Sequence, residues 1–353
     1  MVRRFIALLI WGCLTVGSIC AQTSGGQGPQ HNSLSATPGA AAAPQPSRPP
    51  ADPHKFALII SGASGEEAYA KQFAQWTEGL RRALTERLGF GQERVKILAE
   101  QATEGGAGRS TAVEVTRALE ALRLSASPNS TVFIFLIGHG TFDGKEAKFN
   151  LVGPDLPVAA YNNLLKSLPA ERIVIFNMAS ASGEFVKPLA ARGRVIITAT
   201  RSGQEQNATR FAEHFIAALT EREADTDQNG RISILEAFNY ATLQTAGYYK
   251  RAGRLATEHA LLEDNGDGVG HQAAEGGDGA VARVTYLDSL SVEQAAANAH
   301  TLKLLRERTR LDEEIAQLKA RKAEMPSVEY EAALERMLIE LAKVSRDIRK
   351  AGQ

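Results

Sequence analysis

The sequence predicts an α/β fold with a doubly wound, mostly parallel β-sheet that is covered by helices on both faces. Residues 131–140 (TVFIFLIGHG) form an unbroken run of β-branched and aromatic residues that ends in a glycine–histidine–glycine turn. A strand that is apolar on both faces is typical of the middle of a parallel sheet, where helices cover both sides. Similar runs alternate along the chain with segments of helical periodicity, as a doubly wound fold requires.

The strands and helices can be assigned in order along the chain. Short apolar runs predict strands at residues 56–61, 95–98, 131–137, 172–176 and 194–198. Apolar side chains recur at helical spacing over residues 69–88, 115–122 and 159–168, and in a helix that Asn207 opens. Thr111 and Glu114 form a capping box before the second helix, and a short hairpin is expected around Asp143. Right-handed crossovers place these strands in one sheet.

The first 53 residues predict export, followed by an unstructured tether. Residues 1–21 combine a basic start, an apolar stretch and a small-residue end, as in a secretory signal peptide that is cleaved near Ala21. Attachment of a lipid at Cys20 is the alternative. Because Cys13 and Cys20 are the only cysteines, cleavage leaves a mature protein without a disulfide or a thiol. Residues 22–53, rich in Pro, Ala and Gly, are expected to be disordered, and a domain follows at 54–290.

Composition narrows the class of partner. The formal net charge is zero, from 40 Lys and Arg against 40 Asp and Glu residues. Nucleic-acid-binding domains usually carry a basic footprint, so no nucleic-acid partner is expected. The sequence also lacks a phosphate-cradling glycine loop and the ligand spacing of a zinc site.

Two strand ends carry the candidate catalytic residues. His139 follows the strand at 131–137, and the glycines on either side leave its imidazole uncrowded. The strand at 172–176 runs into a turn of small residues that contains Ser180. Chemistry in such sheets collects at the carboxyl ends of the strands, so we expect His139 and Ser180 to be neighbours in space.

His139-Gly140 and the segment 179–183 (ASASG) resemble the active-site segments of the caspase and legumain superfamily of cysteine peptidases. In that family a His-Gly follows one central strand, and an Ala-Cys, commonly followed by Ser-Gly, follows the next. The resemblance covers roughly residues 56–243 and implies a caspase-like fold. It also implies that the loop at 199–205 shapes a specificity pocket, with Gly140, Arg201 and Glu205 as candidate substrate-binding residues; a solvated polar loop is the alternative.

The sequence departs from this family at the residue that carries the chemistry, because the position of the nucleophilic cysteine is Ser180. A serine hydroxyl is a poor nucleophile unless a base takes its proton and a third group orients that base. Asp143 and Asp155 are candidates to orient His139, although the spacing of neither identifies it.

Residues 225–236 (DTDQNGRISILE) match the EF-hand calcium loop, with Gly230 at its sharp turn. The expected ligands are Asp225, Asp227, Asn229, the carbonyl of Arg231, Ser233 directly or through water, and a bidentate Glu236. The sequence therefore predicts one Ca²⁺ site, with a structural role. The acidic segment at 263–268 lacks the rest of this pattern and is expected to be a mobile surface loop.

From residue 291 the sequence predicts a helical arm. Apolar residues repeat every seven positions at Leu304, Leu311, Leu318 and Met325, and the pattern resumes after Pro326. Two helices over 291–353 are expected to pair as an antiparallel hairpin or coiled coil. Arg308 and Lys322 fall at positions that the seam would make apolar, so a long uninterrupted coiled coil is not expected. A cap on the domain, and an arm for self-association or for a partner helix, are the two interpretations.

These observations predict an exported caspase- or legumain-like peptidase homologue, impaired in catalysis, that binds a peptide or protein. One alternative is an active hydrolase with Ser180 as nucleophile and His139 as base. The other is an envelope scaffold that acts through its C-terminal helices.

Overall fold

A computed structural model describes residues 51–103, 106–288 and 299–351. All of the described residues belong to one compact unit of the chain. The predicted signal peptide and nearly all of the predicted tether lie outside the described residues. Within them, Asp52 already pairs with Phe90, two residues before the expected start of the domain. None of the described helices combines the length and the apolar character needed to cross a membrane.

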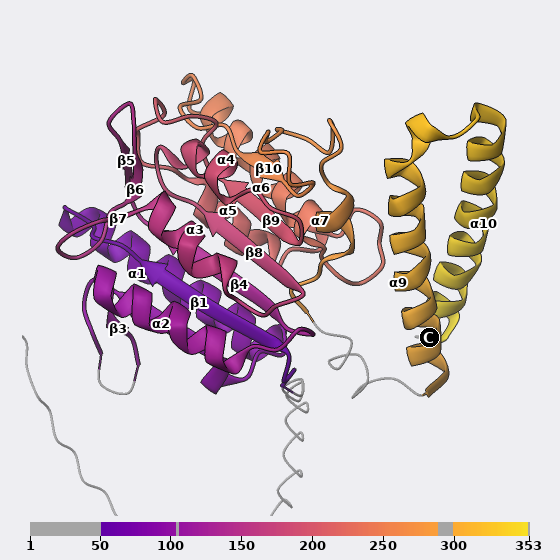
Figure 1. The fold of residues 1–353 in the computed structure, drawn as a ribbon, viewed down its shortest axis with the longest axis horizontal. Coiled ribbons are helices and arrows are strands. Elements are labelled where there is room, and N and C mark those ends of the chain that lie inside the picture. The colour runs from indigo at the N-terminus through magenta and orange to yellow at the C-terminus, as the bar shows by residue number, and fades with distance from the viewer. Residues whose placement is uncertain (1–50, 104–105, 289–298, 352–353) are drawn as a thin grey trace, which may run out of the picture. The chain divides into compact units, whose positions relative to one another are not determined.

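A seven-stranded sheet forms the centre of the domain, in the order β10-β9-β8-β4-β1-β2-β3 (Figure 1). All neighbouring strands are parallel except β10, which runs antiparallel to β9. The strands are β1 Lys55–Ser61, β2 Val95–Ala99, β3 Gly108–Arg109, β4 Thr131–Ile137, β8 Arg172–Asn177, β9 Arg194–Thr198 and β10 Leu261–Glu263. Each of the predicted strands is present; β3 and β10 were not predicted from the sequence.

Successive side chains of a strand point to opposite faces of the sheet. Because the central strands are apolar throughout, both faces are apolar, and helices cover both. In β4, Phe133 and Phe135 face one hydrophobic core, whereas Val132 and Ile134 face the other. The first core is closed by α1 Glu67–Arg82, η1 Ala83–Arg87, α5 Phe211–Ala218 and α6 Ile234–Arg251. The second is closed by α2 Ala112–Ser125, α3 Val158–Lys166 and α4 Val186–Leu189. The predicted α/β class, with a mostly parallel sheet between two helical layers, is confirmed.

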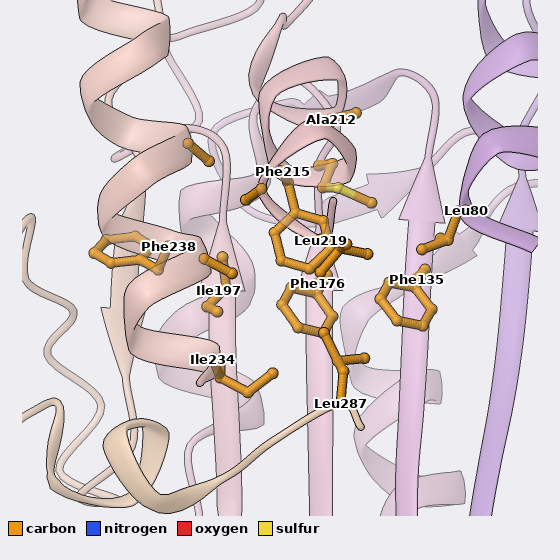
Figure 2. Packing of buried hydrophobic residues seen from close by; sticks show 14 of the residues in the cluster. Leu80, Phe135, Phe176, Ile197, Ala212, Phe215, Leu219, Ile234, Phe238 and Leu287 are labelled. Atoms are coloured by element: carbon orange, nitrogen blue, oxygen red, sulfur yellow. The ribbon is translucent and has the colours of Figure 1, made fainter. Parts of the chain in front are cut away.

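Stacked aromatic rings join the central strands to the helices of the first core (Figure 2). The rings of Phe135 and Phe176, from neighbouring strands, lie parallel with centroids 4.8 Å apart, and Phe215 of α5 packs 4.5 Å from Phe176. Full burial of such a side chain contributes about 1.5–3 kcal/mol. This layer therefore holds β4 and β8 firmly, together with the loops that follow them.

A three-stranded antiparallel sheet follows β4, made of β5 Gly140–Phe142, β6 Ala147–Phe149 and β7 Leu156–Pro157. The predicted hairpin around Asp143 is confirmed and gains a third strand. The carboxylate of Asp143 accepts hydrogen bonds from the backbone of Lys145 and Glu146, so it closes the hairpin turn.

The sequence predicted that this helix starts at Asn207, but α5 begins at Phe211. The backbone N–H groups of Arg210 and Phe211 donate to the carboxylate of Glu258, which lies far along the chain. The residues before Phe211 have other partners, since the Thr209 hydroxyl donates to the carbonyl of Met178 at 2.6 Å. Short segments complete the domain: η2 Gln92–Arg94, η3 Ser182–Phe185, η4 Arg222–Ala224 and α7 Ala280–Val284.

The C-terminal arm is a helical hairpin of α9 Ala299–Ala320 and α10 Ser327–Ala351, which pack against each other (Figure 1). The chain turns between them through η5 Lys322–Glu324, just before Pro326, as predicted. Leu311, Ile315 and Leu318 are buried. Of the two charged residues at seam positions, Arg308 is buried and Lys322 lies in the turn.

Candidate functional site

The parallel register of β4 and β8 brings the two candidate strand ends to one level. Leu136 lies opposite Asn177, and His139 and Ser180 each follow three residues after this pair. Both residues therefore lie at the carboxyl edge of the sheet, on adjacent loops. This placement follows from the length of the two strands, which the sequence indicates well.

The Ser180 side chain is buried, with 2% of its surface exposed, and bonds to the backbone of Gly140. The N–H of Gly140 donates to the Ser180 hydroxyl oxygen at 3.1 Å, and this hydroxyl donates to the carbonyl of Gly140 at 3.1 Å. A β-carbon on Gly140 would lie 2.4 Å from the carbonyl oxygen of Ser180, so only glycine fits here. Ser180 thereby ties the end of β8 to the first strand of the small sheet.

The turn after Ser180 is held in a strained conformation. Ala181 has a left-handed backbone with φ of 53°, which costs a non-glycine residue on the order of 1 kcal/mol. Its N–H donates to the carbonyl of Glu205 at 2.8 Å. Gly183 approaches so closely that a β-carbon there would lie 2.3 Å from the Arg201 backbone. The predicted specificity loop and the Ser180 turn are therefore packed together as one unit.

The imidazole of His139 packs against helix α1. Its ring lies edge-on to Tyr69, with centroids 4.7 Å apart, and 5.1 Å from Phe73. Burial lowers the pKa of His139, opposed by a hydrogen bond with the Ser64 backbone and by the charge of Glu66. In the described part of the chain, no hydrogen bond joins His139 to Ser180.

The two candidate orienting acids are engaged elsewhere. Asp143 closes its own hairpin turn, and Asp155 accepts a hydrogen bond from the N–H of Leu151 at 2.8 Å. Neither is hydrogen-bonded to His139 among the described residues, so a complete serine–histidine–acid relay is not assembled.

Glu205 is bound to other residues of the chain. Its carboxylate accepts hydrogen bonds from the N–H of Arg201 at 2.9 Å and of His259 at 3.2 Å. The His259 Nδ1 lies 2.5 Å from the same carboxylate, and the Arg201 guanidinium 3.2 Å from it. Sequence reasoning missed His259, because its partner Glu205 lies 54 residues away in the chain. The half-buried His259 joins the predicted loop to the start of β10.

A pocket with a volume of about 390 Å³ lies between α1, the segment before α5 and the end of α6. Tyr69, whose ring contacts His139, forms part of its wall. The guanidinium of Arg210 lies over the ring of Tyr248, 4.7 Å from its centroid. The lining is rich in tyrosine, arginine and amide groups: Tyr69, Gln72, Asn207, Arg210, Tyr248, Tyr249 and Arg254. These groups offer aromatic rings for stacking and N–H and O–H donors for hydrogen bonds.

The wall of this pocket is fastened to the sheet by buried polar contacts. Glu258 accepts hydrogen bonds from the N–H of Arg210 and from the hydroxyl of Tyr249, at 2.8 Å and 3.0 Å. Burial raises the pKa of Glu258, and these hydrogen bonds oppose the rise. Thr209 connects the same wall to Met178, two residues before Ser180. The pocket wall is therefore in contact with the residues that follow β4 and β8, through Tyr69 and Thr209 respectively.

The loop at 225–236 folds around its own carboxylates. Asp225 accepts hydrogen bonds from the N–H groups of Asn229 and Gly230, and Gly230 has the left-handed φ of 80° that a sharp turn requires. Ser233 caps α6 in a capping box with Glu236. One oxygen from each of Asp225, Asp227 and Glu236 lies within 4.8 Å of the others. Burial raises the pKa of Asp225, with further contributions from the charges of Glu236 and Asp227.

This donor set suits calcium, because carboxylate, amide and carbonyl oxygens are the ligands of a hard cation. Asp225, Asp227, Asn229 and Glu236 would supply side-chain oxygens, and Arg231 and Ser233 would complete the set as the pattern predicts.

The acidic segment at 263–268 lies at the surface only in part: Asn265, Gly266 and Asp267 are exposed, but its first two residues are buried, which the sequence did not predict. Glu263 ends β10, which pairs with β9, and its side chain is fully buried. Asp264 is also buried and accepts hydrogen bonds from the N–H groups of Gly279 and Ala282, so it caps α7. The glycines allow the backbone to fold back onto these carboxylates, and the segment is part of the structural frame.

Comparison with known proteins does not assign a family. No family model matches the sequence, and no curated protein matches it. Among solved structures, the chain is similar to a protein from Geobacter sulfurreducens at 12% identity and a TM-score of 0.42, over 59% of this chain and 92% of that one. It is also similar to the Drosophila initiator caspase Dronc at 10% identity and a TM-score of 0.42, over 64% of this chain and 84% of that one. The described chain is thus an α/β protein with a strand-edge pocket and an acidic loop.

Proposed function

We propose that this chain is an exported, catalytically impaired homologue of the caspase and legumain peptidases that binds a peptide or protein. The environment of Ser180 carries the proposal. Its hydroxyl is buried and bonded to the backbone of Gly140, whereas His139 lies against α1. A serine that lacks a hydrogen-bonded base is not activated for attack. Ser180 then serves to fix the small sheet to β8.

Peptide binding is supported by the pocket whose wall includes Tyr69, the residue that contacts His139. Its lining combines aromatic rings with the guanidinium groups of Arg210 and Arg254. Tyrosine and arginine are among the residues enriched where binding energy concentrates. Because the pocket wall and the Ser180 turn share one buried frame, a peptide in the pocket would lie along the carboxyl edge of the sheet.

The active hydrolase is the second candidate, because His139 and Ser180 follow neighbouring strands at the same level. Catalytic hydrogen bonds are often longer or poorly aligned in the absence of substrate. For this candidate, the Ser180 hydroxyl must leave Gly140 and the imidazole must turn from Tyr69. Turnover of a peptide therefore separates the two proposals.

We also propose that residues 225–236 bind one Ca²⁺ ion with a structural role. Bound there, the ion would supply positive charge to three clustered carboxylates. The loop joins α5 and η4 to α6, so its order governs how α6 packs on the first core.

Selection from a displayed peptide library tests the binding proposal, with binding of the selected peptide measured for the mature protein. Arg254→Gln removes an exposed guanidinium at the pocket and is expected to weaken binding about tenfold, the equivalent of one charged hydrogen bond. Arg192→Gln, an exposed change before β9 at the other edge of the sheet, is the matched control. If no peptide is selected, or Arg254→Gln binds as well as the control, the pocket is not the binding site.

A further inference from the structure

We propose that helix α9 of the C-terminal arm docks on the 225–236 loop through Arg308, and that Ca²⁺ binding to the loop weakens this docking. The inference rests on the calcium site proposed above and goes beyond it, since it assigns the loop a regulatory role. It makes the arm a segment whose attachment depends on calcium.

The exit of the loop is joined to the segment that leads into the arm. Ser233 pairs with Tyr286 in an antiparallel bridge, and the N–H of Ile234 donates to the carbonyl of Thr285. The Arg231 guanidinium forms an ion pair with Asp288 at 2.7 Å and lies over the Tyr286 ring. These contacts tie the end of the loop to the segment that precedes the arm.

Arg308 of α9 reaches the entrance of the same loop. Its Nη2 lies 2.8 Å from the Oδ2 of Asp227, and its Nε lies 3.7 Å from the carboxylate of Asp312 on its own helix. The Arg308 side chain is 9% exposed. A buried guanidinium needs a compensating negative charge, and Asp227 supplies it from outside the arm.

Calcium and Arg308 therefore act on one carboxylate. Asp225, Asp227 and Glu236 carry three negative charges, and a divalent cation among them reduces this to one. The electrostatic attraction between the loop and Arg308 therefore weakens. Asp312, which lies on α9 itself, remains beside Arg308 and does not hold the arm to the loop. The coupling between the two binding events is reciprocal: if Ca²⁺ weakens docking by some factor, docking weakens Ca²⁺ binding by the same factor.

Calorimetric titration of the mature protein with CaCl2 measures how much the docking of Arg308 weakens Ca²⁺ binding. Arg308→Gln is expected to raise Ca²⁺ affinity about tenfold, within the usual range of such couplings. Arg310→Gln is the matched control, because Arg310 is two residues away and pairs with Glu307 and Glu314 of its own helix. This control is expected to bind Ca²⁺ as the unsubstituted protein does.

The distance between two spin labels, one on the domain and one on α9, measures whether Ca²⁺ loosens the docking of the arm. The mature chain has no cysteine of its own if the leader is cleaved, so Ser125→Cys on α2 and Lys319→Cys on α9 provide unique sites. A narrow distance distribution is expected without Ca²⁺ and a broad one with it; Arg308→Gln should be broad in both conditions.

Equal Ca²⁺ affinity in the Arg308→Gln and control proteins would overturn the competition while leaving the calcium site intact. Absence of Ca²⁺ binding in all of them would overturn the calcium site together with the competition. A distance distribution that neither Ca²⁺ nor Arg308→Gln alters would overturn the docking itself.

Discussion

Replacement of Ser180 by alanine should destabilise the domain, because the hydroxyl both donates to and accepts from the backbone of Gly140. Each such hydrogen bond contributes about 0.5–1.5 kcal/mol, and the site is too buried for water to replace the hydroxyl easily. We therefore expect the free energy of unfolding to fall by roughly 1–3 kcal/mol. With a urea slope of about 2–3 kcal/mol per M, the unfolding midpoint should fall by roughly 0.3–1.5 M.

Urea unfolding followed by near-ultraviolet circular dichroism is a suitable assay, since the buried aromatic rings report on the core. Ser125→Ala, at the exposed end of α2, is the control and should change the free energy by less than about 0.5 kcal/mol. If Ser180→Ala unfolds at the same urea concentration as the control, the hydroxyl does not support the fold, and the structural role assigned to it is wrong.

Three further predictions concern other parts of the frame. Gly140→Ala places a β-carbon 2.4 Å from the Ser180 carbonyl oxygen, so it should lower the free energy of unfolding by about 1–3 kcal/mol in thermal or urea unfolding. Gly79→Ala in α1, where the nearest atom to the new β-carbon is 3.5 Å away, should raise the free energy of unfolding by about 1 kcal/mol. Equal stability of the two variants would refute the close approach. Asp278 raises the pKa of His271 above its usual value of 6.5, so this pair stabilises the fold fully below pH 6.5 and loses its contribution as pH rises through the higher folded-state pKa. The melting temperature should therefore fall between pH 6 and pH 8 by an amount that this ion pair contributes. In Asp278→Asn that contribution should be absent, whereas the control His54→Gln, at an exposed residue, should keep it. If the fall in melting temperature between pH 6 and pH 8 is the same in Asp278→Asn as in the unsubstituted protein, the role assigned to the His271–Asp278 pair is wrong. Glu236→Gln should lower Ca²⁺ affinity by at least about tenfold in calorimetry, because it removes one charged oxygen of the expected bidentate ligand, and Glu221→Gln outside the loop should not; equal affinities would exclude Glu236 as a ligand.

The sequence predicted the sheet well because strands β1, β4, β8 and β9 lie in its interior. Such strands are apolar on both faces, and their runs end where the strand ends. Edge strands lack this signal: β10 contributes only Leu261–Glu263, and it owes its place to pairing with β9. The same limit explains why the sequence did not predict the burial of Glu263 and Asp264, since this burial depends on α7 and on β9, which local sequence does not indicate.

At the candidate site, the sequence predicted which residues come to the edge of the sheet but not where their side chains point. Strand length alone brings His139 and Ser180 to one level. The direction of the imidazole is set by α1, because Tyr69 and Phe73 both pack against its ring. Likewise, the pairing of Glu205 with His259 joins residues 54 apart in the chain. Contacts of this kind arise from tertiary packing and leave no spacing in the sequence.

The most direct test of the account is hydrolysis of a mixed fluorogenic peptide library by the mature protein, beside Ser180→Ala and Ser180→Cys forms, with and without Ca²⁺. The account predicts no turnover by the unsubstituted protein, together with binding of the selected peptide at the pocket. Turnover by the unsubstituted protein that disappears in the Ser180→Ala form would contradict it, and would establish Ser180 as a nucleophile.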